Sequence, residues 1–369
     1  MTRAVGADEL AHWLRLVLTP GVGGETGRRL LGAFGPPEQI FAAGCSALRE
    51  VVPERIARAL SEPLPDDARS QIDKAIAWVG QPGNQIVTLA DAVYPAALLN
   101  IPDPPLLLYV KGRLDLLSRP AIAVVGSRNA TAQGVANAEK FSEVLSHGGL
   151  TIISGLALGI DTAAHKGGLR GRGSTVAVIG TGADIVYPAR NRGLAHQLAD
   201  EGCIISEYPL GTPAIASNFP RRNRIVSGLS RGVLVIEAAA QSGSLITARM
   251  AGDQGRDVFA IPGSIHSPLS KGCHLLIKQG AKLVESAQDI LDELGTGVST
   301  HATAVVPAEE VQLSADDPLL AAMGFDPVDI DTLAARCQCD IASVTARLLA
   351  LELDGLLEML PGGTYRRMA

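Results

Sequence analysis

The sequence of 369 residues contains few aromatic residues and few cysteines. Phe, Trp and Tyr together make up 4 % of it, and five cysteines are present. An odd number of cysteines in a chain of this length does not form a disulfide framework and fits a reducing compartment. Cys337 and Cys339 form a C-x-C, but no second pair of Cys or His lies near them at zinc spacing. We interpret them as ordinary helix cysteines and expect no metal.

Long apolar runs are missing as well. No stretch of eighteen apolar residues occurs, and the first residues lack the basic, apolar and small-residue pattern of a signal peptide. We therefore expect a cytoplasmic protein with no membrane partner. Hydrophobic residues make up 47 % of the chain and Gly occurs 40 times. This composition indicates an α/β protein built from Ala, Val, Ile, Leu and Gly, with two or three domains.

Charge is distributed unevenly along the chain. Residues 118–286 carry 17 Lys and Arg against 11 Asp and Glu, a net charge of +6. Residues 1–117 have a net charge of −2 and residues 287–369 one of −10, which together give the total of −6. A basic middle between acidic flanks predicts a site for a polyanion on the central part alone.

The order of the patterns predicts five segments. Residues 1–65 read as a helical helix–hairpin–helix (SAM-like) module, and residues 66–117 as a bridge whose prolines favour extended connections. Residues 118–295 form the central α/β domain, and residues 296–315 a linker. Residues 316–369 read as three helices and a β-hairpin, which suggests a winged helix. Its acidic charge favours contact with a protein over a phosphate backbone.

The N-terminal module has a turn of possible function. Two stretches with helical spacing flank "TPGVGG", and Arg28 and Arg29 follow this turn. Such a turn can hold a DNA phosphate on its backbone N–H groups. A small helical module for protein contact is an equally good interpretation, because the segment is slightly acidic.

The central domain repeats strand, glycine turn and helix. Its apolar runs are continuous and rich in β-branched residues, as in parallel strands covered by helices on both faces. They predict a doubly wound sheet. The runs are "AIAVVG" (121–126), "LTIISG" (150–155), "STVAVIG" (174–180), "GCIISE" (202–207), "GVLVIEA" (232–238), "DVFAIPG" (257–263) and the short "AKLVE" (281–285).

The turns after these strands predict one pocket for an anion. Ligands of doubly wound sheets bind beyond the carboxyl ends of the strands, and here these ends are followed by glycine and small polar or basic residues. A dinucleotide site is disfavoured. The first turn, "GSRNATAQG", lacks G-x-G-x-x-G, the second strand ends in "IISG" without an acid, and no P-loop occurs.

The stretch "FPRRNRIVSG" (219–228) strengthens this prediction. Residues 208–236 contain no acid but four arginines, whereas a solvated helix face normally mixes both signs. Tyr187 and Tyr208 end neighbouring strands. Guanidinium groups beside aromatic rings are typical of a surface that binds single-stranded nucleic acid. We expect Phe219 and the arginines to face the strand-end pocket and "IVSG" to enter the core.

Four titratable residues have alternative interpretations. Asp161 and His165 lie four residues apart and could serve catalysis or a metal, but we favour Asp161 as a helix cap and His165 as a locally bonded residue. Glu207 and Glu237 end strands and could form an acid–base pair. Since arginines are near, we favour both as partners that orient arginines.

The central domain resembles the DprA (Smf) family of DNA-processing proteins of natural transformation. The match covers about residues 100–286 in the family's order, and its motifs are highly specific. They are "VVGSRNAT", "ISGLALGIDTAAH", "VIGTGADIVYPARN", "ISEYPLGT", "NFPRRNRIVSGLS", "VIEAAAQSGSLITA", "GRDVFAIPGSI" and "KGCHLLIKQGA".

The resemblance implies an extended Rossmann fold and a homodimer formed through it. It also implies binding and protection of single-stranded DNA and loading of the recombinase RecA, with no catalytic step and no cofactor. Motif positions assign the DNA contacts to Gly126, Ser127, Arg128, Lys166, Asn218, Phe219, Arg222, Asn223 and Arg224, followed by Ser242, Gly243 and Ser244.

An alternative is a nucleotide-processing hydrolase similar to the lysine-decarboxylase-like phosphoribohydrolases. Their P-G-G-x-G-T-x-x-E signature corresponds here to "QSGSLITARMAGDQG", which has no glutamate. The absence of this glutamate disfavours a hydrolase.

Overall fold

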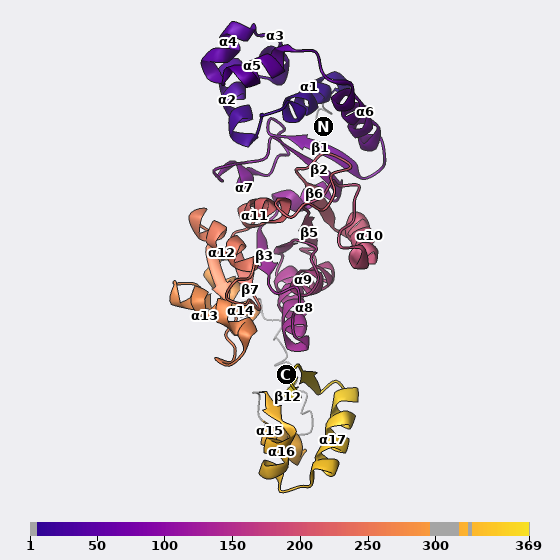
Figure 1. Cartoon of the computed structure of the whole chain (residues 1–369), viewed down its shortest axis with the longest axis vertical. Helices are drawn as coiled ribbons and strands as arrows, with labels where there is room; N and C mark the ends of the chain where they lie inside the picture. Colours follow the sequence, from indigo (N-terminus) through magenta and orange to yellow (C-terminus); the bar gives the residue numbers. More distant parts are fainter. Residues whose placement is uncertain (1–5, 296–316, 324–326, 369) are drawn as a thin grey trace.

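The computed structural model describes residues 6–295, 317–323 and 327–368, so the predicted linker over 296–315 lies outside these ranges. A helical bundle, an α/β domain and a small C-terminal domain follow one another along the long axis (Figure 1). No helix in the described parts of the chain is long and apolar enough to cross a lipid bilayer.

The helical bundle contains the predicted hairpin. The turn "TPGVGG" lies between two helices, and Gly21 adopts a positive φ of 88° there. Leu16, Leu30 and Leu60 are fully buried in the core of the bundle. Its helices are α1 (Ala7–Leu18), α2 (Gly24–Phe34), α3 (Pro37–Ala42), α4 (Cys45–Val51), α5 (Glu54–Ser61) and α6 (Asp66–Val79).

A nine-stranded sheet forms the α/β domain, in the order β1-β2-β6-β5-β4-β3-β7-β8-β9. All pairs from β6 to β9 are parallel, which confirms the predicted doubly wound, mostly parallel sheet. The strands are β1 (Asn84–Thr88), β2 (Leu107–Gly112), β3 (Ala121–Val125), β4 (Thr151–Ser154), β5 (Thr175–Val178), β6 (Cys203–Ser206), β7 (Gly232–Val235), β8 (Asp257–Ala260) and β9 (Lys282–Leu283).

The bridging segment is more regular than its prolines suggested. Helix α7 (Ala96–Leu99) was not predicted in this region, whereas strand β2 is extended, as its prolines favour. β2 pairs antiparallel with both β1 and β6. Prolines 102, 104 and 105 all precede β2, so its own apolar residues remain free to form ladder hydrogen bonds.

Helices cover both faces of the sheet because side chains of each strand alternate between them. In β3, Ala121, Ala123 and Val125 pack on one face, and Ile122 and Val124 on the other. The first face is covered by α11 (Asn218–Leu229), α12 (Ser244–Asp253) and α13 (Lys271–Lys278). The second is covered by α8 (Ala132–His147), α9 (Ile160–Leu169), α10 (Arg192–Glu201) and α14 (Ala287–Glu293).

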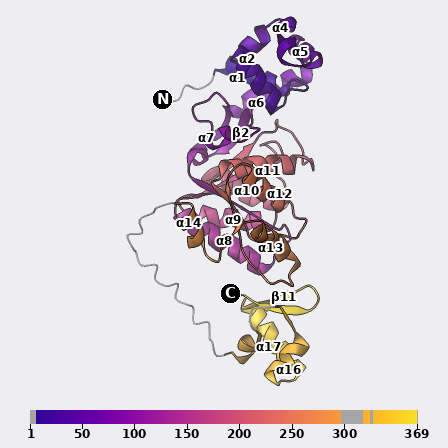
Figure 2. The same cartoon turned by 90° about the vertical axis from the view of Figure 1, so that its left-hand side faces the viewer.

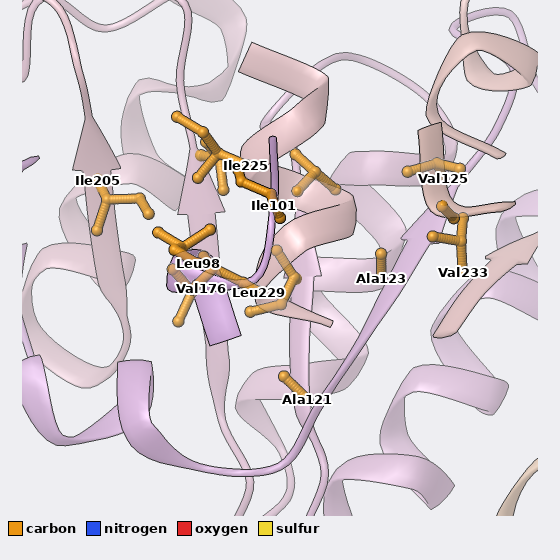
Figure 3. Packing of buried hydrophobic residues seen from close by; sticks show 14 of the residues in the cluster. Leu98, Ile101, Ala121, Ala123, Val125, Val176, Ile205, Ile225, Leu229 and Val233 are labelled. Atoms are coloured by element: carbon orange, nitrogen blue, oxygen red, sulfur yellow. The ribbon is translucent and has the colours of Figure 1, made fainter. Parts of the chain in front are cut away.

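The C-terminal half of α11 enters the core as predicted. Ile225 and Leu229 project onto the sheet beside Leu98 of α7 and Ile101 (Figure 3). Ile225 is fully buried. This packing fixes α11 as a rigid element whose N-terminal turn lies at the carboxyl ends of the strands.

The C-terminal domain is a winged helix, as predicted. A three-stranded sheet of order β10-β12-β11 packs against three helices and lies apart from the helical bundle (Figure 2). Its elements are α15 (Pro318–Met323), β10 (Val328–Asp329), α16 (Ile330–Cys337), α17 (Ile341–Leu353), β11 (Leu357–Leu360) and β12 (Thr364–Arg367).

Candidate nucleic-acid interface

A pocket of about 690 Å³ lies at the carboxyl ends of β3, β4, β5 and β7. The turns after these strands and the first turns of α11 and α12 supply its walls. Nine of the twelve predicted site residues line it: Gly126, Ser127, Arg128, Phe219, Arg222, Asn223, Ser242, Gly243 and Ser244.

Arg128 and two aromatic rings form one wall of the pocket. The guanidinium carbon of Arg128 lies 5.8 Å from the centre of the Phe219 ring. The ring of Tyr187 is 5.6 Å from that of Phe219 and tilted by 41°. Tyr187 is 48 % exposed, so its ring is open to a ligand. Within the described ranges Arg128 forms no hydrogen bond or ion pair, and its positive charge is free to meet an anion.

Arg222 lies at the base of the pocket and holds the turn after β4. Its side chain is buried and donates hydrogen bonds to the carbonyl oxygens of Gly155 and Val178 and to Oδ1 of Asn223. A Cβ atom at residue 155 would lie 2.2 Å from the Arg222 guanidinium, so only glycine permits this approach. The Asp161 carboxylate accepts hydrogen bonds from the N–H groups of Gly155 and Ala157. Arg222 and Asp161 thus hold the same turn from two sides.

Serines 242 and 244 also line the pocket. Their hydroxyl groups are 2.7 Å apart, and Ser242 Oγ accepts a hydrogen bond from the N–H of Ser244, the first residue of α12. Small side chains at this helix N-terminus leave space for a phosphate near the positive end of the helix dipole.

Three predicted site residues lie outside the pocket. Lys166 is exposed on α9, and Asn218 donates a hydrogen bond from Nδ2 to the carbonyl oxygen of Gly180. The expectation that Arg224 faces the pocket is wrong. Its guanidinium forms ion pairs with Glu207 at 2.6 Å and Asp103 at 3.1 Å, because that face of α11 points toward the helical bundle.

The two strand-end glutamates have different partners. Glu207 pairs with Arg224 and lies 3.5 Å from Arg221, which confirms it as an arginine partner. For Glu237 the same prediction was wrong: its carboxylate accepts hydrogen bonds from the backbone and hydroxyl of Thr131 at the start of α8. Neither carboxylate remains free to act as a general acid or base in the pocket.

Asp161 and His165 have structural partners too. Asp161 does not cap α9; it binds the preceding turn, and burial raises the pKa of its carboxyl group while the charge of Arg222 opposes that shift. His165 is buried, and its Nδ1 lies 2.7 Å from Oγ1 of Thr175. That hydroxyl donates to the Ile152 carbonyl, so it accepts from a protonated Nδ1. No metal-binding cluster occurs among the described residues.

We expect His165 to make the fold sensitive to acid. Burial lowers the pKa of its imidazole from 6.5 to about 3. The unfolded chain therefore binds a proton between these values and the folded chain does not, so stability falls as the pH drops below 6.5. At pH 5.5 the loss is about 1.4 kcal/mol. Urea unfolding at pH 7.5 and 5.5 measures this loss of stability. The loss should be smaller in His165→Gln, and it should be retained in the control His147→Gln, which alters an exposed histidine.

The arginines after the N-terminal turn are occupied within the protein. Arg28 donates hydrogen bonds to the carbonyl oxygens of Pro102 and Pro104 and lies 3.5 Å from Asp103. Arg29 donates to the carbonyl oxygen of Val51. The Arg28 contacts bind the helical bundle to the segment before β2, and the Arg29 contact lies within the bundle. Because both arginines are occupied, the contacts favour the protein-contact interpretation of the module over a DNA phosphate at the turn.

The structure adds pocket residues that sequence reasoning missed. Asn129, Gln241 and Thr247 line the pocket beside predicted residues. All three lie inside the quoted motifs "VVGSRNAT" and "VIEAAAQSGSLITA", so membership of a motif was the available signal. Ala214 and Ala216 come from the loop before α11, and no property of their side chains marked them.

Two family models and several known proteins match this chain. The model described as DNA recombination-mediator protein A matches residues 85–295, and the DprA winged helix domain matches residues 303–363. Protein Smf of Escherichia coli is 42 % identical over 304 residues, which cover 81 % of each chain.

Solved structures agree with the sequence matches. DNA processing protein A from Streptococcus pneumoniae is 39 % identical, with a TM-score of 0.64, and the match covers 79 % of this chain and 98 % of that one. DNA processing protein A from Helicobacter pylori, described with a single-stranded DNA binding mode, is 31 % identical with a TM-score of 0.52, covering 57 % and 95 %. The fold, the strand-end motifs and these matches agree: the chain belongs to the DNA recombination-mediator protein A family.

Proposed function

We propose that this protein binds single-stranded DNA in the strand-end pocket, protects it, and loads RecA recombinase onto it during natural transformation. The proposed contacts are eleven of the twelve residues from the motifs, with Arg128 and Phe219 at their centre. Lys166 and Asn218 act from outside the pocket, whereas Arg224 holds α11 in place through its ion pairs. The work is non-catalytic, needs no cofactor and takes place in the cytoplasm.

The arrangement of Arg128, Phe219 and Tyr187 carries this proposal. A single strand exposes the faces of its bases and a phosphate at every nucleotide, and this wall offers rings for stacking beside an unpaired cation. A base pair inside a duplex hides its faces, so the same wall discriminates against double-stranded DNA. The Helicobacter pylori relative, whose description names a single-stranded DNA binding mode, supports this interpretation.

A fluorescence titration across a salt series tests the proposal. Labelled oligo-dT should bind much more tightly than a duplex of equal length, and its affinity should fall as salt rises because phosphates release counterions. Equal affinity for both DNA forms would contradict a single-strand site. RecA loading is tested by the lag before RecA filaments form on DNA covered by a single-strand binding protein, which this protein should shorten.

We propose a homodimer formed through the α/β domain. The groove between α12 and α13 is lined by apolar and polar residues. Ile246 and Leu275 on these helices and Leu283 on β9, the last strand of the sheet, remain 37 %, 42 % and 45 % exposed. Such side chains gain from burial against a second copy.

Leu275→Asp should therefore weaken the dimer roughly tenfold or more, because a carboxylate would be buried in an apolar contact. Light scattering after size-exclusion chromatography measures the mass over a concentration series. Leu99→Asp, which alters a 54 % exposed leucine of α7, should leave it unchanged. Equal masses for both variants would place the dimer contact elsewhere.

A further inference from the structure

The wing of the C-terminal domain contacts the α/β domain beside the pocket. The Glu358 carboxylate on β11 accepts a hydrogen bond of 2.9 Å from the backbone N–H of Ala132, the first residue of α8. The same carboxylate accepts a hydrogen bond of 3.0 Å from Nε of Arg366 on β12. The side chains of Glu358 and Arg366 are 14 % and 15 % exposed. Arg366 thus orients Glu358 toward α8.

The contacted amide lies close to the proposed DNA contacts. Ala132 is four residues after Arg128, at the end of the loop that forms one side of the pocket. The preceding residue is bonded within the domain: Thr131 donates to Glu237, and its hydroxyl oxygen accepts from the N–H of Gly134. The N–H of Ala132 instead donates to the wing, at the positive end of a 16-residue helix.

A carboxylate at this place resembles a phosphate in charge and in hydrogen bonding. Both groups are anions that accept hydrogen bonds from backbone N–H groups at a helix N-terminus. The described residues of the C-terminal domain, 317–323 and 327–368, carry 7 Asp and Glu against 4 Lys and Arg, a net charge of −3. Charges interact over a Debye length of about 8–10 Å at physiological salt, so a DNA strand that passes Ala132 would be repelled by the Glu358 carboxylate.

We propose that the docked wing is an intramolecular competitor of single-stranded DNA. In the docked state Glu358 occupies the α8 N-terminus and its acidic domain opposes the strand; release of the wing opens that side of the pocket. This inference rests on the proposed function of the pocket. It assigns the acidic domain a regulatory role that does not require it to touch DNA.

Glu358→Gln tests the competition, with Asp354→Asn as its control. Both variants remove one negative charge from the same domain, but Asp354 is exposed and makes no contact with α8. Glu358→Gln should raise the affinity for oligo-dT about fivefold, as expected if the undocked state holds about one-fifth of the wild-type population. Asp354→Asn should leave it within twofold.

Ala132→Pro gives the same test without altering the wing. Proline is well tolerated as the first residue of a helix, and Thr131 already has the extended backbone, φ −70° and ψ 162°, that precedes proline. The substitution removes only the backbone N–H that donates a hydrogen bond to the Glu358 carboxylate. It should also raise the affinity for oligo-dT, and it keeps the inference testable if Glu358→Gln disturbs the wing through Arg366.

Hydrogen exchange of the full-length protein without DNA reports docking directly. Peptides covering Ala132–Gly134 should exchange faster in Glu358→Gln than in wild type or Asp354→Asn. If oligo-dT binds the wild type but neither Glu358→Gln nor Ala132→Pro binds more tightly, the competition is refuted and the pocket assignment stands. If the wild type and both variants all fail to bind oligo-dT, the proposed function itself fails.

Discussion

Replacing Arg222 with alanine is expected to lower the free energy of unfolding by about 3–5 kcal/mol, the range for removing one partner of a buried charged pair. The guanidinium is 4 % exposed and donates to two backbone carbonyls that end neighbouring strands. Without it, these carbonyls lose their donor, and the buried Asp161 loses the positive charge that opposes the rise of its pKa. The truncated side chain also leaves a cavity under α11.

Urea unfolding followed by circular dichroism measures this loss, and the neighbouring arginine provides the control. The side chain of Arg221 is 53 % exposed, so Arg221→Ala should cost less than about 1 kcal/mol. The loss in Arg222→Lys should lie between the losses in Arg221→Ala and Arg222→Ala, because an ammonium group keeps the charge but cannot reproduce the planar guanidinium geometry. Equal losses for Arg221→Ala and Arg222→Ala would refute the supporting role of Arg222.

A double-mutant cycle separates charge from packing. The double variant Arg222→Met/Asp161→Asn should lose less unfolding free energy than the sum of the two single losses, by at least about 1 kcal/mol. The reason is that each substitution removes the charge that compensates the other residue. Strict additivity would show that Arg222 acts through its carbonyl contacts alone.

The sheet and the location of the pocket could be predicted from the sequence because local patterns determine them. Continuous apolar runs such as residues 121–126 pack on both faces, and this property is visible in the letters alone. Parallel strands place their carboxyl ends at one edge, so the turns with Arg128 and Ser242 had to meet. Topology brought together residues more than a hundred positions apart.

The roles of individual arginines could not be predicted, because they depend on helix rotation and distant partners. Successive residues of a helix point about 100° apart, so Arg221, Arg222 and Arg224 face three directions. Arg224 meets Asp103, which lies 121 positions away, and no local pattern marks that pair. The two predicted ligand arginines of α11 thus separate into Arg222 at the base of the pocket and Arg224 outside it.

The wrong assignment of Glu237 has the same cause. Its strand end was correctly located, but its partner there is the start of α8, not an arginine. Thr131 follows the adjacent strand β3, and β3 and β7 are neighbours in the sheet although their first residues, Ala121 and Gly232, lie 111 positions apart in the sequence. The order of the strands in the sheet, which the sequence does not show, determines that the Glu237 carboxylate contacts Thr131.

Arg128→Ala and Phe219→Ala are each expected to weaken binding of oligo-dT by about 1–3 kcal/mol, or roughly fivefold to more than a hundredfold. Phe219 loses a stacking surface, whereas Arg128 loses a phosphate contact. Only Arg128→Ala should flatten the plot of log affinity against log salt, by about 0.7 for the one phosphate released. Arg55→Ala, which removes an exposed arginine from the helical bundle, should change neither affinity nor slope.

The double variant shows whether the two side chains serve one nucleotide. Since the Arg128 guanidinium lies 5.8 Å from the Phe219 ring, the ring helps to position the cation, and losing both should cost more than either single loss but less than their sum. A fully additive loss would place the base and the phosphate on separate nucleotides. An unchanged affinity in both single variants, with their folds intact by circular dichroism, would instead exclude this wall as the DNA site, because it holds the pocket's only exposed arginine among the described lining residues.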